Sequence, residues 1–373
     1  MGNEKPLGMQ RLRSLDALRG FDMFWIAGGG SLFVALANLT EWPILEWWKT
    51  QLTHVAWHGF RFEDMIFPLF LFIAGISFPF SLAKRCQTAD DRRGMVRHVI
   101  QRGLVLVLLG IIYGNGIRFN FSELRYGSVL GHIGLAWMFA ALIFMNCRIK
   151  TCLVWFGGIL IGYWLLLRFS LAPDLGSTDP YSMEGSIVGY VDRLFLPGKL
   201  YKKIHDPEGI LSTIPAIATA MLGMLTGNFV MRKPADAKPA DTVIKMVLVA
   251  IALLAIGWLW NFVFPINKNL WTSSFVCFVG GISLLLFTLF YMVIDVWKIE
   301  KWSFFFVVIG MNSITIYLAP RIIDFNKAAQ FFFGSLIGLF PKDWSGVLNA
   351  TAYLIIVWVF LYFLYRKKIF LKV

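Results

Sequence analysis

The sequence predicts an all-α, polytopic helical membrane protein with about ten transmembrane helices and both termini in the cytoplasm. Its 373 residues are 58% hydrophobic and only 15% charged, and the mean hydropathy is +0.66. Soluble domains are typically about 25% charged, so this composition points away from water. Apolar runs of about 20 residues also recur along the whole chain, as helices that cross a bilayer require.

The apolar runs predict one integral-membrane domain that covers residues 1–373. The first run contains "AGGGS" and lacks a small-residue cleavage pattern, so we interpret it as a span rather than a signal peptide. The apolar segment 328–340 is short for a span, and we expect it to be interfacial or re-entrant. The predicted spans are 18–38, 64–83, 103–117, 129–146, 151–168, 209–231, 246–264, 271–294, 303–319 and 346–365.

The distribution of Lys and Arg predicts the orientation. With the segment 1–17 inside, alternate connections hold most of the 35 basic residues, and this bias indicates the cytoplasmic side. By the same assignment the whole net charge of +13 lies on that side, and the outer side is neutral. A basic cytoplasmic face is usual for membrane proteins, and it also suits a polyanionic ligand such as a nucleotide or coenzyme A. The longest outer loop is predicted at 169–208.

One stretch places two histidines and two acids directly before a predicted span. "THVAWHGFRFEDMIFPLF" contains His54, His58, Glu63 and Asp64. We expect Asp64 to cap the N-terminus of the second span and also to pair with His54, which would orient that imidazole as a base. The H-x-x-x-H spacing occurs in zinc proteases, but Val55 stands where they carry Glu and no third ligand is evident. We therefore predict no metal site.

Polar residues inside the predicted spans leave two interpretations open. They include Asp22, His132, Asn312 and Ser313. Because polar groups are costly in a bilayer, they often mark a functional pathway, but hydrogen bonds between helices explain amides and hydroxyls equally well. Residues alone thus indicate a basic cytoplasmic face and an outer His/Asp site, with polar residues in the spans between them.

Several motifs occur in order along the chain: "RLRSLDALRGFDMFW", "HVAWHGFRFEDMIFPLFLFIAGIS", "GYVDRLFLPGKLY", "DPEGILSTIPAI", "INKNLWTSSFV", "GMNSITIYL" and "LYRKKIFLKV". Together they resemble the heparan-α-glucosaminide N-acetyltransferases and their bacterial relatives. The similarity extends from about residue 11 to the C-terminus. A shorter part of the first motif, "RSLDALRG", is similar to a signature of a wider superfamily of membrane acyltransferases.

The resemblance implies a single membrane acyltransferase domain that transfers acetyl from cytosolic acetyl-CoA to a glucosamine amine on the outer side. Acetyl-CoA would be a co-substrate, without a metal. The family's active-site histidine falls on His54 and its nearby aspartate on Asp64. The resemblance also implies a role in substrate binding for Arg125, Glu208, Asn312 and Ser313, and we expect Arg19 and Arg102 on the basic side to contact the coenzyme. A bacterial inner membrane, a lipid-bilayer environment and a homodimer fit this interpretation, and no nucleic-acid partner is expected.

This sequence departs from the family at a few positions. A family asparagine before the glycine triplet is replaced around Ile26–Ala27, a Gln-Arg pair reads Gly131-His132, and His58 replaces an asparagine. Substrate preference is therefore open. The alternatives are O-acetylation of a cell-envelope glycan, proton-coupled sugar transport through His54 and Asp64, and a catalytically silent membrane scaffold.

Overall fold

The computed structural model describes residues 12–86, 88–114, 123–232 and 238–371. This part of the chain is helical, and its only strand-like pairings are two isolated bridges, Arg125 with Gly198 and Leu171 with Ser186. The predicted all-α fold is therefore confirmed. The helices are α1 (Arg13–Phe24), α2 (Gly30–Thr40), α3 (Pro43–Gln51), α4 (Glu63–Arg85), α5 (Ala89–Tyr113), α6 (Val129–Asn146), α7 (Ile149–Phe169), α8 (Ile187–Phe195), α9 (Thr213–Met231), α10 (Pro239–Trp260), α11 (Ser273–Phe290), α12 (Phe304–Gly310), α13 (Ser313–Leu318), α14 (Phe325–Ile337) and α15 (Ser345–Arg366).

Nine helical stretches in the described residues are long and apolar enough to cross a membrane. A tenth results if the bent pair Lys301–Gly310 and Ser313–Arg321, whose two parts meet at 59°, counts as one span. The prediction of about ten spans is thus confirmed. The end predicted for the third span, 115–117, lies outside the described residues. The nine stretches are Arg13–Thr40, Glu63–Arg85, Asp90–Tyr113, Val129–Asn146, Ile149–Phe169, Thr213–Met231, Pro239–Trp260, Ser273–Val296 and Lys342–Arg366.

The first span bends at a π-helical turn, Trp25–Gly29, between α1 and α2. Gly28 has φ of +116°, a conformation that L side chains rarely adopt. A Cβ at Gly28 would also lie 2.8 Å from the Tyr353 ring of α15. Gly28 of the "AGGGS" sequence therefore permits both the bend of the first span and the close approach of α15.

Helices α4 and α9 form the closest pair in the centre of the molecule. A Cβ at Gly75 would lie 2.3 Å from the Ala220 carbonyl oxygen, and one at Gly223 would lie 2.1 Å from that of Phe72. Small residues at such contacts allow two helix backbones to approach closely in a membrane protein. Because α4 begins with Glu63 and Asp64, this contact fixes the helix that carries the predicted site.

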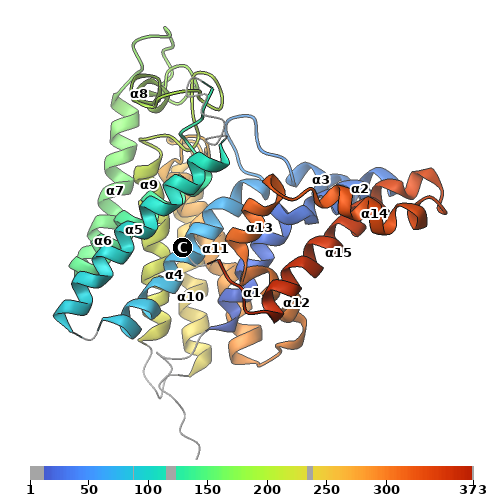
Figure 1. The fold of residues 1–373 in the computed structure, drawn as a ribbon. Helices are drawn as coiled ribbons and strands as arrows, with labels where there is room; N and C mark the ends of the chain where they lie inside the picture. Colours follow the sequence, from blue (N-terminus) through green and yellow to red (C-terminus); the bar gives the residue numbers. More distant parts are fainter. Residues whose placement is uncertain (1–11, 87, 115–122, 233–237, 372–373) are drawn as a thin grey trace, which may run out of the picture.

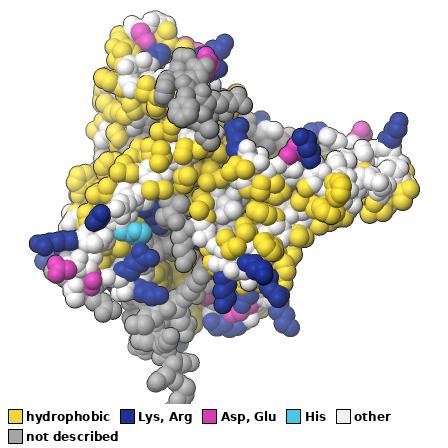
Figure 2. Space-filling view, viewed as in Figure 1, with side chains coloured by type: hydrophobic (Ala, Val, Ile, Leu, Met, Phe, Trp, Pro, Cys, Tyr) yellow, Lys and Arg dark blue, Asp and Glu magenta, His cyan; other side chains and the backbone are white. Residues whose placement is uncertain are grey.

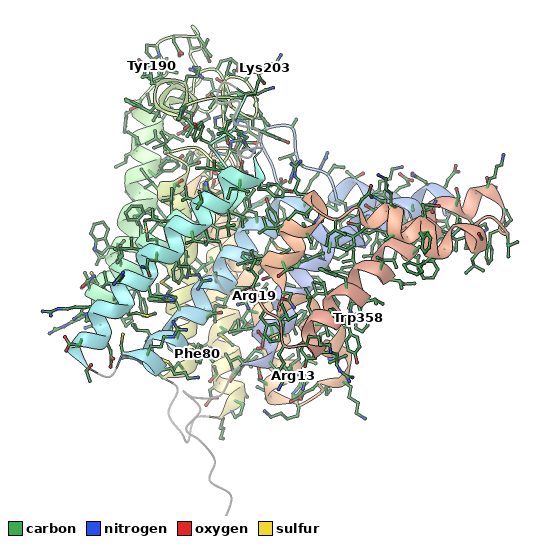
Figure 3. The ribbon with its side chains drawn as sticks, in the orientation of Figure 1. Arg13, Arg19, Phe80, Tyr190, Lys203 and Trp358 are labelled. Carbon is green, nitrogen blue, oxygen red and sulfur yellow. The ribbon has the colours of Figure 1, made fainter. Side chains whose placement is uncertain are left out.

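The remaining helices surround this pair and leave two distinct ends (Figure 1). The segment around α8 lies above α7 and α9, whereas α2, α3, α14 and the start of α15 project together to the right. The start of α1, marked by Arg13, and Phe80 near the end of α4 lie toward the opposite, lower end (Figure 3). A broad hydrophobic surface separates the two ends, and Lys and Arg side chains gather along the lower edge (Figure 2).

We expect Gly223→Val to destabilise the fold, because the new side chain has to displace the α4 backbone. Overpacking of a close contact typically costs about 1–3 kcal/mol, and here the obstacle is a carbonyl group. The melting temperature of the purified protein in detergent should fall by about 5 °C or more. Gly158→Val on α7 is the matched control, since a Cβ there meets nothing within 4 Å. Equal melting temperatures for the two variants would contradict the prediction.

Candidate functional site

His54 and Asp64 form the pair that the sequence predicts. His54 Nδ1 lies 2.8 Å from Asp64 Oδ1, and the other carboxylate oxygen accepts a hydrogen bond from the Arg61 backbone N–H at 3.1 Å. An ionised carboxylate only accepts hydrogen bonds, so we assign the proton of the neutral imidazole to Nδ1. The Asp64 side chain is 1% exposed and that of His54 is 54% exposed. The imidazole is therefore held at Nδ1, while about half of the side chain is open to a ligand.

The prediction that Asp64 caps the second span is wrong. Helix α4 begins at Glu63, so Asp64 lies inside its first turn, and the residue before the helix, Phe62, makes no side-chain cap. The Asp64 carboxylate binds the Arg61 N–H, which precedes the helix, and this bond ties the His54 loop to α4. The carboxylate still lies at the positive end of the helix dipole, where negative charge is favoured.

Lys268 is a functional candidate that the sequence reasoning missed. Its Nζ lies 3.3 Å from His54 Nδ1, 3.5 Å from His54 Nε2 and 3.8 Å from Asp64 Oδ1. Burial lowers the pKa of Lys268, although the Asp64, Glu208 and Glu63 carboxylates oppose that effect. Lys268 lies in the motif "INKNLWTSSFV", one of those that carry the family resemblance, so its place in that motif was the signal that could have identified it.

The loop that carries Lys268 docks on the loop that carries His54. Gly59 N–H donates to the Ile266 carbonyl at 2.8 Å, and Asn267 Nδ2 lies 3.2 Å from His58 Nδ1. Burial also lowers the pKa of His58, against a raising effect of Asp179. His58 therefore serves the contact between the loops. Among the described residues no group of three or more His, Cys, Asp or Glu is arranged to hold a metal ion.

Arg125 and Glu208, both predicted to bind substrate, meet in a second polar cluster at the same end. The Arg125 guanidinium donates to both carboxylate oxygens of Asp206, at 2.8 and 2.6 Å, and also to Glu208. Burial alone would lower the pKa of Arg125, but the hydrogen bonds to Asp206 and the charge of Glu208 raise it above its ordinary value. Asp206 is fully buried and accepts both arms of the guanidinium fork, a role that the sequence reasoning did not assign.

Asp192 holds the segment that carries Asp206 and Glu208. It lies on α8, its Oδ1 accepts the Ile210 N–H at 2.9 Å, and its Oδ2 is buried without a hydrogen-bond partner among the described residues. A Cβ at Gly209 would lie 2.1 Å from Oδ2, so the segment passes directly over the carboxyl group. Burial raises the pKa of Asp192 to about 7.

Arg19 and Arg102, the predicted coenzyme contacts, line a cavity of about 480 Å³. Figure 3 places Arg19 further from the lower end than Arg13, at the level of the central helices. Arg85 and His98 line the same cavity, as do Phe370 and Leu371 from the C-terminal segment. Arg102 lies over the Trp137 ring at 4.4 Å, and its buried Nε has no hydrogen-bond partner among the described residues. The cavity thus presents several cations to one space.

A small apolar pocket of about 40 Å³ continues from this cavity. Both spaces share Phe70 and Ser313, and the small one extends to Phe67 and Tyr317. Ser313 was predicted to bind substrate and does line this route. Asn312 lines neither space but stands at the break between α12 and α13, where Thr315 donates to its side-chain oxygen at 3.4 Å.

The chain is similar to known proteins along most of its length. Residues 11–258 match the family model described as heparan-alpha-glucosaminide N-acetyltransferase, catalytic. The human heparan-alpha-glucosaminide N-acetyltransferase is 27% identical over 432 residues, which cover 97% of this chain and 60% of the human protein. The mouse protein of the same name is 25% identical, with the same coverage of both chains. The chain thus spans about 60% of the length of these relatives.

We expect the segment around α8 to lose stability as the pH rises toward 7, because of Asp192. Its pKa is raised from an ordinary value near 3.9 to about 7, so the folded state binds the proton more tightly than the unfolded state. This contribution to stability is complete below about pH 4 and is lost as the pH rises through 7. The melting temperature of the wild type should fall by a few degrees between pH 5 and 7.5.

Asp192→Asn should remove most of that slope, since the amide keeps an acceptor for the Ile210 N–H and does not titrate. Asp174→Asn is the control, because Asp174 is exposed and hydrogen bonds from Arg193 lower its pKa. A slope that persists in Asp192→Asn would show that another group causes the pH dependence.

Proposed function

Because the chain belongs to the heparan-α-glucosaminide N-acetyltransferase catalytic family, we propose that it is a membrane acetyltransferase whose donor is acetyl-CoA and whose acceptor is the amine of a glucosamine-type sugar. The observation that carries the proposal is the pair of His54 and Asp64, in which a buried acid orients an exposed imidazole. Such a pair is suited to remove a proton from an attacking amine.

The inner cavity suits the donor. Coenzyme A carries several phosphate charges, and Arg19, Arg85 and Arg102 supply cations around a space whose volume is typical of small-molecule sites. Guanidinium groups favour phosphate because their planar fork matches its oxygens. The unbonded Nε of Arg102 is a buried donor that a phosphate oxygen would satisfy. The apolar route past Phe70 and Ser313 leads on from this cavity, and the pantetheine arm would enter it once the side chains that line it move apart.

The residues at the His54 site account for each proton that moves in the proposed transfer. The acceptor first loses one proton to water to become a neutral amine. Its nitrogen then forms a bond to the acetyl carbon while His54 Nε2 takes the second proton. The carbon–sulfur bond breaks, the sulfur leaves as a thiolate, and the imidazolium returns the proton to it. Asp64 stabilises the imidazolium, and the Lys268 ammonium, 3.5 Å from Nε2, is close enough to stabilise the carbonyl oxygen as it becomes negative.

Arg125 and Glu208 act in this proposal as the acceptor-side polar cluster. Both groups are tied to the same segment through Asp206 and lie on the end of the molecule that carries His54. Lys268 interacts electrostatically with Glu208 as well as with Asp64, so the two clusters belong to one charged region. The Glu208 carboxylate and the Tyr201 ring, which stacks on Arg125 at 4.6 Å, present an acceptor and an aromatic face to a sugar.

The proposal also assigns the two sites to opposite sides of the membrane. Residues 1–373 would form one acyltransferase domain in a bacterial inner membrane, with Arg19 and Arg102 open to the cytoplasm and His54 facing outward. The distribution of basic residues supports this orientation, since the connections predicted to be cytoplasmic carry the whole net charge of +13. A homodimer is part of the proposal by family membership alone.

The decisive experiment measures transfer of radiolabelled acetyl from acetyl-CoA to glucosamine by the purified protein. We expect transfer by the wild type and a loss of about 100-fold or more in kcat for His54→Ala, because general-base catalysis is typically worth that much. His58→Asn is the matched control, since His58 contacts Asn267 rather than the reacting groups, and it should stay within about threefold of wild type.

The other outcomes separate the alternatives. Transfer to a hydroxyl sugar in place of glucosamine would make the protein an O-acetyltransferase. Sugar uptake into proteoliposomes without consumption of acetyl-CoA would support a transporter, and a folded protein that does neither would be a scaffold.

Arg102→Gln should weaken donor binding. The loss of a charged hydrogen bond to phosphate is worth about 1.5–3 kcal/mol, so the KM for acetyl-CoA should rise by about tenfold or more while the KM for the acceptor stays constant. Arg97→Gln is the control, because Arg97 lies on the same helix but is exposed and does not line the cavity. An unchanged KM for acetyl-CoA in Arg102→Gln would contradict the proposal that the phosphates of the coenzyme bind in this cavity.

A further inference from the structure

A further cavity lies between α7, α9 and α10, and the proposed reaction does not use it. Its volume is about 790 Å³, and Leu284 of α11 also lines it. It shares no lining residue with the cavity of Arg19 and Arg102, which we call the arginine cavity. We call the further space the α9–α10 cavity.

The α9–α10 cavity lies toward the same end of the molecule as the arginine cavity. In the close pair of helices, Gly223 of α9 meets Phe72 of α4, and Gly227 meets Ile76. The two contacts are four residues apart in the same order on both helices, so α4 and α9 run in the same direction. Helix α4 ends at Arg85, which lines the arginine cavity. The end of α9 therefore lies toward that side as well.

One end of the α9–α10 cavity is polar, and the rest is apolar. The polar end is formed where α9 ends and α10 begins, and its side chains are Asn228, Arg232, Thr242 and Lys245. The apolar part is lined by Leu153, Leu222, Leu225, Phe229, Leu248 and Val249. Leu153, Leu248 and Val249 are each more than half exposed, at 53%, 60% and 51%, so this part opens to the hydrophobic surface of the molecule. Such a space fits an amphipathic ligand.

Two buried polar side chains at the polar end lack a partner. Asn228 is 8% exposed and Thr242 is 3% exposed, and both line the cavity. Neither side chain makes a hydrogen bond with a residue that the structure describes. Thr226, also on α9, instead donates to the Leu222 carbonyl at 2.9 Å. Because buried polar groups normally have partners, an oxygen of a ligand in the cavity would satisfy the amide and the hydroxyl.

Basic residues surround the polar end. Arg232 and Lys245 line it, and neither forms an ion pair within the described part of the chain. Asp241 also lines the cavity, in the first turn of α10, where the helix dipole favours a carboxylate. Further exposed cations lie at the starts of α7 and α10, namely Arg148, Lys150 and Lys238. The excess of cations favours a ligand with an anionic head.

We propose that the α9–α10 cavity binds one anionic phospholipid from the adjoining leaflet of the membrane. The phosphate lies between Arg232 and Lys245, lipid oxygens accept hydrogen bonds from Asn228 and Thr242, and an acyl chain extends along the apolar part. Basic pockets between transmembrane helices recognise anionic headgroups in this way. The inference does not rest on the proposed acetyl transfer, because the two cavities share no residue.

Native mass spectrometry of the purified full chain in detergent tests the proposal. The protein is titrated with dioleoyl phosphatidylglycerol and, separately, with dioleoyl phosphatidylcholine, which has the same acyl chains but no net charge. We expect a single phosphatidylglycerol to bind about tenfold or more tightly than phosphatidylcholine. Glycerol 3-phosphate, which carries the phosphate without acyl chains, should not compete at the same concentration.

Arg232→Gln combined with Lys245→Gln should weaken phosphatidylglycerol binding by about 25-fold, because each basic residue near an anionic headgroup contributes about fivefold. Binding of phosphatidylcholine should change little. Lys84→Gln combined with Arg93→Gln is the matched control. These two residues are exposed, lie toward the same end of the molecule and line neither cavity, so the control should keep the preference of the wild type.

Asn228→Leu separates ligand binding from a structural role, because leucine has nearly the size of asparagine and lacks the amide. If no ligand uses the amide, its removal is harmless, since a buried polar group without a partner is costly to the fold. We expect the melting temperature of the lipid-free variant to equal or exceed that of the wild type. Its affinity for phosphatidylglycerol should nevertheless fall by about tenfold.

Four results would overturn the proposal. The first is equal affinity of the wild type for the two phospholipids, and the second is an unchanged preference in the Arg232 and Lys245 double variant. Competition by glycerol 3-phosphate would show that the cavity takes a soluble anion instead of a lipid. A dimer that forms only without phospholipid would show that a second copy of the chain covers the cavity.

Discussion

The hydrogen bond between His54 Nδ1 and Asp64 Oδ1 is the interaction on which the rest of the candidate site depends. It joins a loop whose imidazole is half exposed to the first turn of a helix that is mostly buried, and the glycine contacts between α4 and α9 hold that helix in place. The loop of Lys268 then docks on the same loop through Gly59. The imidazole is thus oriented by groups from three parts of the chain, and Lys268 lies within hydrogen-bond distance of its Nε2.

The cavity of Arg19 and Arg102 and the pair of His54 and Asp64 are separate sites. In the proposed reaction this separation is both a requirement and an obstacle. A thioester carried from one side of a membrane to the other needs a passage that does not also conduct water or ions. The space past Phe70 and Ser313 holds about 40 Å³, whereas one water occupies about 30 Å³ in the liquid. This opening is too small for a pantetheine arm, so donor binding has to move the side chains that line it. The break between α12 and α13, where the two helices meet at 59°, lies beside this route.

Local patterns in the sequence predicted what depends on short-range physics. Hydropathy located the spans, and the close spacing of His54 and Asp64 indicated their pairing. Contacts between distant loops were not predictable in the same way: Lys268 reaches His54 across more than 200 residues, and Asp206 meets Arg125 across about 80. The capping role predicted for Asp64 was wrong because it depended on the exact first residue of the helix. Helix α4 begins at Glu63, one residue before Asp64, and the Asp64 carboxylate accepts a hydrogen bond from the Arg61 N–H. Such boundaries are where pattern reasoning is least reliable.

The charges around the cavity of Arg19 and Arg102 bear on how the proposed reaction would be accelerated. Arg19, Arg85 and Arg102 face one space, so a polyanion would gain several favourable interactions there. Transfer of an acetyl group changes the thioester and leaves the coenzyme's phosphates as they were, so the same contacts would exist before, during and after the reaction. Contacts of that kind lower the KM for the donor without stabilising the transition state. In the proposed reaction the acceleration therefore has to come from His54, Asp64 and Lys268, which lie together at the other site.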